Sequence, residues 1–289
     1  MRLQYLCYME ALKIIAKIYE HFVGQLKEGK IPISLRLKSL IGTVQDDPFD
    51  NWVEANIRKT LPELEVVHAG SLTTPDLVIR DKRSGTFVGL EIKKLIQLAN
   101  GKDPRGLTMD YNSCLPCGSA LIRVGEETVV IPCFYLFALL SPDSSSIVTL
   151  IIMDGDFLNY DFNLHKKAKF DNVSEYGHGP YGEGSIRHRK MYTYPNPLNY
   201  KLNCFHLRHI LVAKKYDLEK AKQTSKATEV VSREDIFGNS FFYLILDRTG
   251  KSTARDLEKL PVLRDVFKEC KARKEKERTA SMPHLKPNE

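Results

Sequence analysis

Apolar residues recur at the helical period in two stretches near the N-terminus. The first covers residues 3–28, and Gly24 with the lysines that follow it marks its end. The second follows Asp46-Asp47-Pro48, which offers capping side chains, and runs until Pro62. The pattern therefore predicts an opening amphipathic helix and a second helix over about 49–61.

From Glu63 the pattern changes to short runs of β-branched and apolar residues separated by Gly, Ser, Asp and Pro. The expected strands are 64–68, 76–80, 87–93, 120–124, 128–131, 134–140, 147–153 and, later, 241–246, followed by a helical pattern over 255–271. Helices followed by a mostly antiparallel set of strands predict a mixed α/β fold.

Residues 161–209 differ from everything before them, because they show little apolar periodicity and contain five of the eight histidines. A segment this long and irregular inside a compact chain is usually functional or disordered. We therefore expect four parts: a helical N-terminal part with the core at 1–160, a basic irregular region at 161–215, a C-terminal strand and helix at 216–270, and a flexible tail at 271–289.

The most informative stretch is the predicted hairpin over residues 74–94, in which two apolar runs flank a tight turn at Lys82-Arg83-Ser84-Gly85. Strand alternation places Glu91 and Lys93 on one face. A turn centred on Arg83 and Ser84 puts Asp76 opposite Glu91, whereas a bulge at Gly85 would shift the register by one. Two carboxylates and an amine are thus expected to share one corner of the sheet.

Facing carboxylates repel each other unless a cation lies between them, and Mg²⁺ is a hard cation that accepts one or two carboxylates with water and phosphate oxygens. The ammonium group of Lys93 can orient a water or neutralise charge that develops on a phosphate. Glu54, on the preceding helix, offers a further carboxylate or a hydrogen bond to a bound water. These groups together predict a centre for phosphodiester hydrolysis.

Pro75-Asp76, 14 intervening residues and then Glu91-Ile92-Lys93 resemble the PD-(D/E)XK motif of the restriction-endonuclease-like nucleases. Glu54 resembles the extra acidic residue that many members carry. The resemblance covers about 40 to 50 residues and implies a mixed central sheet flanked by helices, with Mg²⁺-dependent hydrolysis of DNA. It also implies metal ligation by Asp76, Glu91 and the backbone carbonyl of Ile92, with Lys93 as the catalytic lysine.

Basic residues are concentrated between 165 and 215, which contains ten Lys and Arg but only three Asp and Glu. This excess equals the net charge of +7 for the whole chain. Such residues neutralise phosphates, and Arg, Lys, Asn and Gln also match the edges of bases. The side chains expected to contact DNA, including those in the loop after the catalytic strand, are Lys94, Asn112, Ser113, Tyr181, Arg187, His188, Arg189, Lys190, Tyr192, Asn196 and Asn199.

The 289 residues are 43% apolar, which is enough for a sizeable core and excludes a histone-like polycation or a charge-rich disordered chain. The longest uncharged stretch, Thr128–Pro142, is 15 residues, whereas a membrane span needs about 20. Charged residues interrupt the apolar N-terminus, and six cysteines are too few for a disulfide scaffold. We therefore expect a cytoplasmic protein with no membrane partner.

These features predict a type II restriction endonuclease that cuts double-stranded DNA at a short sequence with Mg²⁺. The chain shows no helicase motif, nucleotide-binding loop or methyltransferase motif, so a cognate DNA methyltransferase is expected genetically rather than as a bound subunit. A palindromic site favours a homodimer. The alternatives are a repair or junction-resolving nuclease of the same superfamily and a non-catalytic, sequence-specific DNA-binding protein.

Overall fold

The computed structural model describes residues 2–35, 48–68, 75–100, 108–112, 118–159, 191–195, 209–215, 229–234, 240–247 and 284–285. The chain divides into two compact units. Unit 1 consists of Met1–Pro104, Ser119–Ile152 and Met282–Glu289, and unit 2 consists of Arg105–Gly118 and Met153–Ser281. The four-part division expected from composition stays a prediction.

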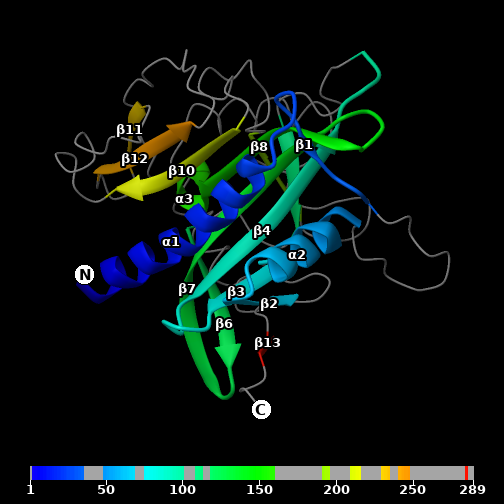
Figure 1. Ribbon diagram of the computed structural model, residues 1–289. Coiled ribbons are helices and arrows are strands. Elements are labelled where there is room, and N and C mark those ends of the chain that lie inside the picture. Colours follow the sequence, from blue (N-terminus) through cyan, green and yellow to red (C-terminus); the bar gives the residue numbers. More distant parts are fainter. Residues whose placement is uncertain are drawn as a thin grey trace. The chain divides into compact units, whose positions relative to one another are not determined.

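Unit 1 contains both predicted N-terminal helices, α1 (Arg2–Gly24) and α2 (Pro48–Thr60). Each buries an apolar stripe, with Ile15 and Ile18 of α1 and Val53 of α2 fully buried. The helices also contact each other, since Phe22 stacks on Trp52 with ring centroids 5.7 Å apart. Figure 1 shows both helices on the same side of the unit 1 strands, where α1 contacts β4 and β7 and α2 contacts β2.

The strands of unit 1 form a mostly antiparallel sheet in the order β8 (Ser146–Asp154), β7 (Glu127–Leu140), β4 (Phe87–Ile96), β3 (Leu77–Asp81) and β2 (Leu64–His68). Two short strands, β1 (Ile31–Pro32) and β13 (His284–Leu285), pair with β8 and with β6 (Ser119–Val124) respectively. The pairing of β4 with β7 is parallel. The expectation of a mixed α/β fold with a mostly antiparallel sheet flanked by helices is confirmed.

Strand β7 corrects one expectation, because the predicted strands 128–131 and 134–140 are a single strand of 14 residues. The strand changes partner in the middle: it pairs antiparallel with β6 up to Pro132 and parallel with β4 from Cys133 onward. Proline has no N–H to donate and is tolerated where a ladder ends. Pro132 therefore marks a change of partner and not the end of a strand.

Unit 2 contains α3 (Gly155–Asn159) and an antiparallel set in the order β11 (Glu229–Glu234), β12 (Ser240–Asp247) and β10 (His209–Lys215). Strand β12 confirms the strand expected at 241–246. A separate two-stranded ribbon pairs β5 (Thr108–Asn112) with β9 (Met191–Pro195). The helical pattern over 255–271 lies outside the described residues.

Strands β9 and β10 lie within the region that was expected to be irregular, so that expectation was wrong at these two places. The sequence of β9, MYTYP, is rich in aromatic and β-branched residues, which favour strands. The run Ile210–Ala213 in β10 is fully apolar, and all four residues are buried. The high density of charged and glycine residues around these short runs hid them.

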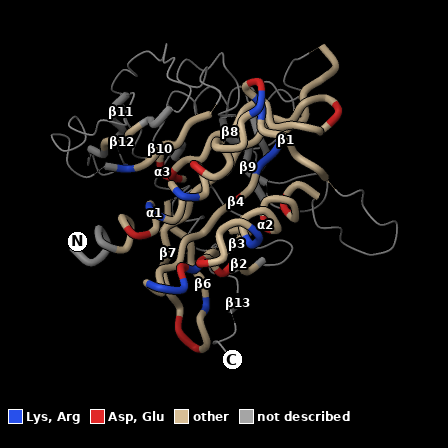
Figure 2. The backbone as a smooth tube through the Cα atoms, in the orientation of Figure 1, with Lys and Arg blue, Asp and Glu red and all other residues tan. Residues whose placement is uncertain are grey.

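Strand β7 carries much of the core and has one charged residue, Glu127 at its start, so Figure 2 shows it as a tan tube beyond the acidic turn that leads into it. Residues 133–140 of β7 are all buried, as are Leu77 and Ile79 of β3. Among the described residues, no helix is long and apolar enough to cross a membrane. Charged side chains buried on such strands require a specific partner or function.

Candidate active site

The predicted hairpin is formed by β3 and β4, and its register is the one that the tight turn predicts. Leu77 faces Leu90 and Val78 faces Gly89, so the next position along would set Asp76 against Glu91. Gly85 adopts φ +69°, yet the register does not shift. The alternative register with a one-residue slip is therefore wrong.

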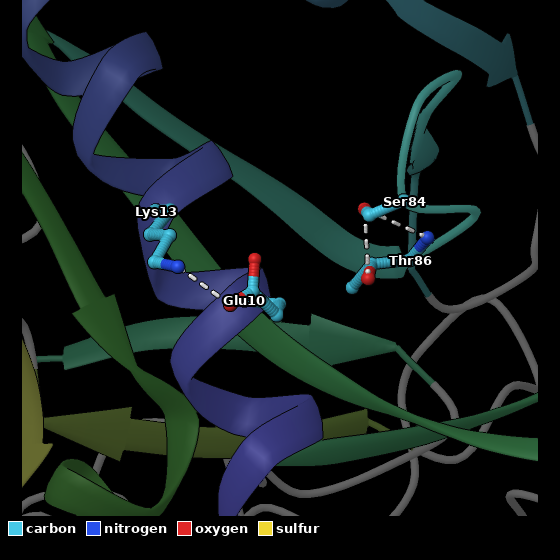
Figure 3. Close-up of polar contacts among 4 residues, drawn as sticks. All are labelled: Glu10, Lys13, Ser84 and Thr86. Carbon is cyan, nitrogen blue, oxygen red and sulfur yellow. Dashed lines mark hydrogen bonds and ion pairs between the residues drawn. The ribbon is translucent and has the colours of Figure 1, made fainter.

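Side chains of the turn between β3 and β4 form hydrogen bonds with the turn's own backbone, and these bonds hold the two strands together at the end far from Asp76 and Glu91. The carboxylate of Asp81 accepts hydrogen bonds from the N–H groups of Arg83 and Ser84 at 2.7 and 3.2 Å. The hydroxyl of Ser84 contacts the hydroxyl and N–H of Thr86 at 3.0 and 3.3 Å (Figure 3). Figure 3 also shows the exposed pair between Lys13 and Glu10 on α1, which belongs to the helix surface and not to the site.

At the other end of the hairpin, Glu91 and Lys93 lie in an apolar setting. Across the parallel ladder Glu91 faces Tyr135 and Lys93 faces Phe137, and these two buried rings stack with centroids 6.0 Å apart. Only 7% of the Glu91 side chain and 17% of the Lys93 side chain are exposed. Aromatic walls of this kind exclude water, which strengthens every electrostatic interaction between the charged groups.

Asp76, Glu91 and Lys93 are joined through one stretch of β4. The Oδ2 atom of Asp76 accepts a hydrogen bond from the N–H of Ile92 at 2.6 Å. The Nζ atom of Lys93 donates to Oε1 of Glu91 at 2.5 Å. The second oxygen of Glu91, Oε2, is buried and accepts no hydrogen bond from the described residues. One carboxylate oxygen is thus held by the lysine while the other remains available.

The environment acts on Glu91 and Lys93 of β4 in different ways. Burial raises the pKa of Glu91 to about 7, the charge of Asp76 acts in the same direction, and Lys93 opposes both. Burial lowers the pKa of Lys93, but the charges of Glu91, Asp76 and Asp50 outweigh it and keep the pKa above its ordinary value. Glu91 therefore ionises reluctantly, whereas Lys93 keeps its proton at neutral pH.

These residues fit a divalent cation of the Mg²⁺ kind. The described residues contain no group of three or more His, Cys, Asp or Glu side chains placed to hold a metal ion. Mg²⁺ does not require such a group, since one or two carboxylates suffice when water and phosphate oxygens complete its shell. The buried Oε2 of Glu91 and the repulsion between Glu91 and Asp76 are what a cation would relieve.

The two acidic residues of α2, Asp50 and Glu54, have different interactions, and the sequence does not reveal this difference. Glu54 forms an ion pair with Arg58 at 2.7 Å, one helical turn along, and 18% of its side chain is exposed. Asp50, one turn earlier, is the acid on this helix whose charge raises the pKa of Lys93. The role expected for Glu54 stays a prediction, and the charge of Asp50 acts on Lys93 although the helical period does not indicate it.

The residues expected to contact DNA are only partly described. Lys94 follows Lys93 in β4 and is partly exposed, whereas Asn112 lies in β5 and Tyr192 in β9. The pairing of β5 with β9 sets Asn112 opposite Met191 and Tyr111 opposite Tyr192. Two candidates 80 positions apart in the chain thus lie at adjacent positions of one ribbon, on opposite faces of it. The others lie outside the described residues: Ser113, Tyr181, Arg187, His188, Arg189, Lys190, Asn196 and Asn199.

Comparison with protein-family models, curated proteins and solved structures gives no match to this chain.

Proposed function

We propose that this chain is a Mg²⁺-dependent endonuclease of the PD-(D/E)XK type, most like a type II restriction enzyme that cuts double-stranded DNA at a short sequence. The observation that carries the proposal is the buried Oε2 atom of Glu91, which accepts no hydrogen bond from the described residues while Oε1 is held by Lys93. Buried polar atoms usually have a hydrogen-bond partner, so a buried carboxylate oxygen without one is a place where a cation could bind.

Each side chain has a separate task in this reaction. Glu91 and Asp76 would hold the cation through carboxylate oxygens, and the backbone of Ile92 between Glu91 and Lys93 fixes the aspartate through its N–H. A bound Mg²⁺ would supply Lewis-acid polarisation of a phosphoryl oxygen and a more acidic water. Lys93 keeps its proton, so it orients the attacking water and neutralises charge on the phosphate instead of removing a proton.

Binding and choice of sequence belong to other parts of the chain. The excess of positive charge between 165 and 215 supplies affinity for the DNA backbone. The β5–β9 ribbon supports a role in reading bases, because the major groove of DNA admits a two-stranded ribbon. Asn112 and Tyr192 lie on opposite faces of this ribbon, so one of the two would face the groove. A homodimer would bring one centre to each strand of a palindromic site.

The test is to incubate the purified chain with Mg²⁺ and unmodified phage or plasmid DNA and to sequence the fragment ends. Discrete fragments with a shared end sequence are expected. Glu91→Gln and Lys93→Ala should abolish cutting and retain binding in Ca²⁺, whereas Lys82→Ala, a lysine at the exposed turn of the same hairpin, should cut normally.

Three other outcomes would contradict parts of the proposal. Cleavage restricted to branched or mismatched DNA would favour a repair or junction-resolving nuclease. Sequence-specific binding without any metal-dependent cutting would favour a non-catalytic DNA-binding protein. Cutting that survives Glu91→Gln and Lys93→Ala would place the active centre elsewhere in the chain.

A further inference from the structure

Strand β4 contains a glycine, Gly89, two residues before Glu91 and on the same face of the strand. Its φ lies outside the left-handed region, so the backbone conformation does not require glycine. The lack of space does require it, because a Cβ at this position would lie 2.8 Å from Cγ and 3.2 Å from Cβ of Pro75, and 3.4 Å from Sγ of Cys133. The buried ring of Pro75 thus occupies the place of a side chain at Gly89.

Pro75 is the residue directly before Asp76, and both precede the first residue of β3. The last strand pair in the hairpin is Leu77 with Leu90, so the ladder does not extend to Asp76. Two contacts hold this segment against β4: the ring of Pro75 on Gly89 and the carboxylate of Asp76 on the N–H of Ile92. Because the ring of proline includes its own N and Cα, a displaced ring also displaces the backbone that leads directly into Asp76.

We propose that Gly89 is a positioning residue, whose missing side chain seats Pro75 against β4 and thereby sets how closely the Asp76 carboxylate approaches Glu91. The consequence for DNA cleavage rests on the proposed function, whereas the positioning itself rests on the contacts of Pro75 and Asp76. A methyl group at Gly89 lies too close to a rigid ring to be accommodated by a rotamer change. The ring, and Asp76 behind it, must move by a few tenths of an ångström or more.

The direct readout is the backbone N–H of Ile92, which reports the hydrogen bond to Asp76 whether or not the protein cuts DNA. With ¹⁵N-isoleucine labelling, Gly89→Ala should shift the Ile92 amide resonance toward its position in Asp76→Ala and speed its hydrogen exchange by about tenfold or more. In the same variant, cleavage should fall by about 10- to 100-fold, because small displacements of reacting groups have effects of that size.

A double variant tests whether the effect passes through the proline ring. Pro75→Ala removes the Cγ atom at 2.8 Å, so adding Gly89→Ala to it should cause a much smaller further change than in the wild type. Adding Gly89→Ala to Cys133→Ala should give the full effect, because the sulfur is the more distant neighbour. Gly24→Ala, at a glycine with open space around it, is the matched control and should change neither readout.

The outcomes separate this inference from the proposed function. An Ile92 amide that is unchanged by Gly89→Ala, or equal effects with and without Pro75, would overturn the inference even if the wild-type chain cuts DNA. An Ile92 amide that responds as expected in a chain that cuts no DNA would uphold the positioning and reject the nuclease. If Gly89→Ala does not fold, Pro75→Ala alone must shift the Ile92 amide, and its failure to do so also overturns the inference.

Discussion

Two clusters in this protein use the same residue types, two carboxylates and a lysine beside a glycine, and differ in how the carboxylates are held. The first is the hairpin cluster of Asp76, Glu91 and Lys93 in unit 1. The second is the unit 2 cluster of Asp154, Asp156 and Lys214. In both, a glycine without a Cβ leaves room for the neighbouring groups, Gly89 in the first and Gly118 in the second.

In the unit 2 cluster the carboxylates bind backbone groups and tie distant segments together. Asp154 accepts the N–H of Asp156 at 2.8 Å, and Asp156 accepts the N–H of Gly118 at 2.9 Å. Lys214 of β10 pairs with the other oxygen of Asp156 at 2.8 Å. These bonds join segments that lie 38 and 58 positions apart in the chain, which is how a structural network stabilises a fold.

The hairpin cluster is arranged differently. Its two carboxylates repel each other, and the pKa of Glu91 is raised to about 7. Its lysine pairs with Glu91 two positions away on the same strand, so this pair joins no separate segments. Composition therefore does not distinguish a structural cluster from a candidate catalytic one. What differs is that the lysine of unit 2 joins distant segments, whereas in the hairpin cluster the charge of Asp76 raises the pKa of Glu91.

The largest expected effect is on cleavage, when each of the two lysines is replaced by methionine in a separate variant. Lys93→Met should lower cleavage by about 100- to 1,000-fold, because it removes the charge that would face the phosphate. It should also lower the free energy of unfolding, because Glu91 then stays buried beside Asp76 without its ion-pair partner. Lys214→Met, the matched variant in unit 2, should lower stability and leave cleavage by the folded protein within about threefold. Cleavage rates and urea unfolding measured on both variants check this, and equal losses of cleavage would remove the distinction.

The next effect is on stability. Asp156→Ala removes the acceptor of both the Lys214 ion pair and the Gly118 hydrogen bond, and should lower the free energy of unfolding by about 3 kcal/mol. Urea denaturation monitored by circular dichroism measures it. Glu10→Ala, which removes an exposed ion pair on α1, should change stability by less than about 0.5 kcal/mol and serves as the control.

The two strands of the hairpin and their register could be predicted from the sequence, because both depend on residues that are close together in the chain. Strand 64–68 matches β2, and the turn at Arg83-Ser84 gives the correct register. The parallel pairing of β4 with β7 and the antiparallel pairing of β5 with β9 join segments far apart in sequence, and a local pattern cannot specify such pairings. Gly89 did offer a local signal, since a glycine inside a strand often marks a close approach of another chain segment.

The choice between Asp50 and Glu54 shows the same limit within one helix. These residues are one turn apart on the same face of α2, so periodicity treats them alike. Which of them acts on Lys93 depends on how α2 is seated, and tertiary contacts such as Phe22 with Trp52 and His21 with Asn56 set that. Helix packing is decided by such contacts between two elements, which the periodicity of one helix does not reveal.

A smaller effect separates function from stability at Glu91. Its pKa is about 7 in the folded chain against an ordinary value of 4.5, so its contribution to stability is complete below about pH 4.5 and is lost as pH rises through 7. Glu91→Gln should therefore stabilise the metal-free protein above pH 7, by on the order of 2 kcal/mol, while abolishing cleavage.

Thermal unfolding from pH 4.5 to 8.5, with and without Mg²⁺, checks this prediction. The wild type should lose stability as the pH rises and regain part of it with Mg²⁺. Glu91→Gln should lose less stability over the same pH range and gain less from Mg²⁺. If Glu91→Gln is less stable than the wild type at pH 8, Glu91 is a structural ion-pair partner like Asp156, and the contrast between the clusters disappears.

The smallest effect distinguishes the two acids of α2. Glu54→Gln removes an ion pair with a half-exposed arginine and should cost only about 0.3–0.5 kcal/mol of stability, with cleavage nearly unchanged. Asp50→Asn removes one of the negative charges that attract the ammonium group of Lys93. The group is then held less firmly, and cleavage should slow by about three- to tenfold, equivalent to about 0.7–1.4 kcal/mol. Both variants keep the side-chain volume, so a difference between them reports charge and not packing. Single-turnover cleavage at saturating Mg²⁺ is the measurement, and a larger loss for Glu54→Gln than for Asp50→Asn would return the role in catalysis to Glu54.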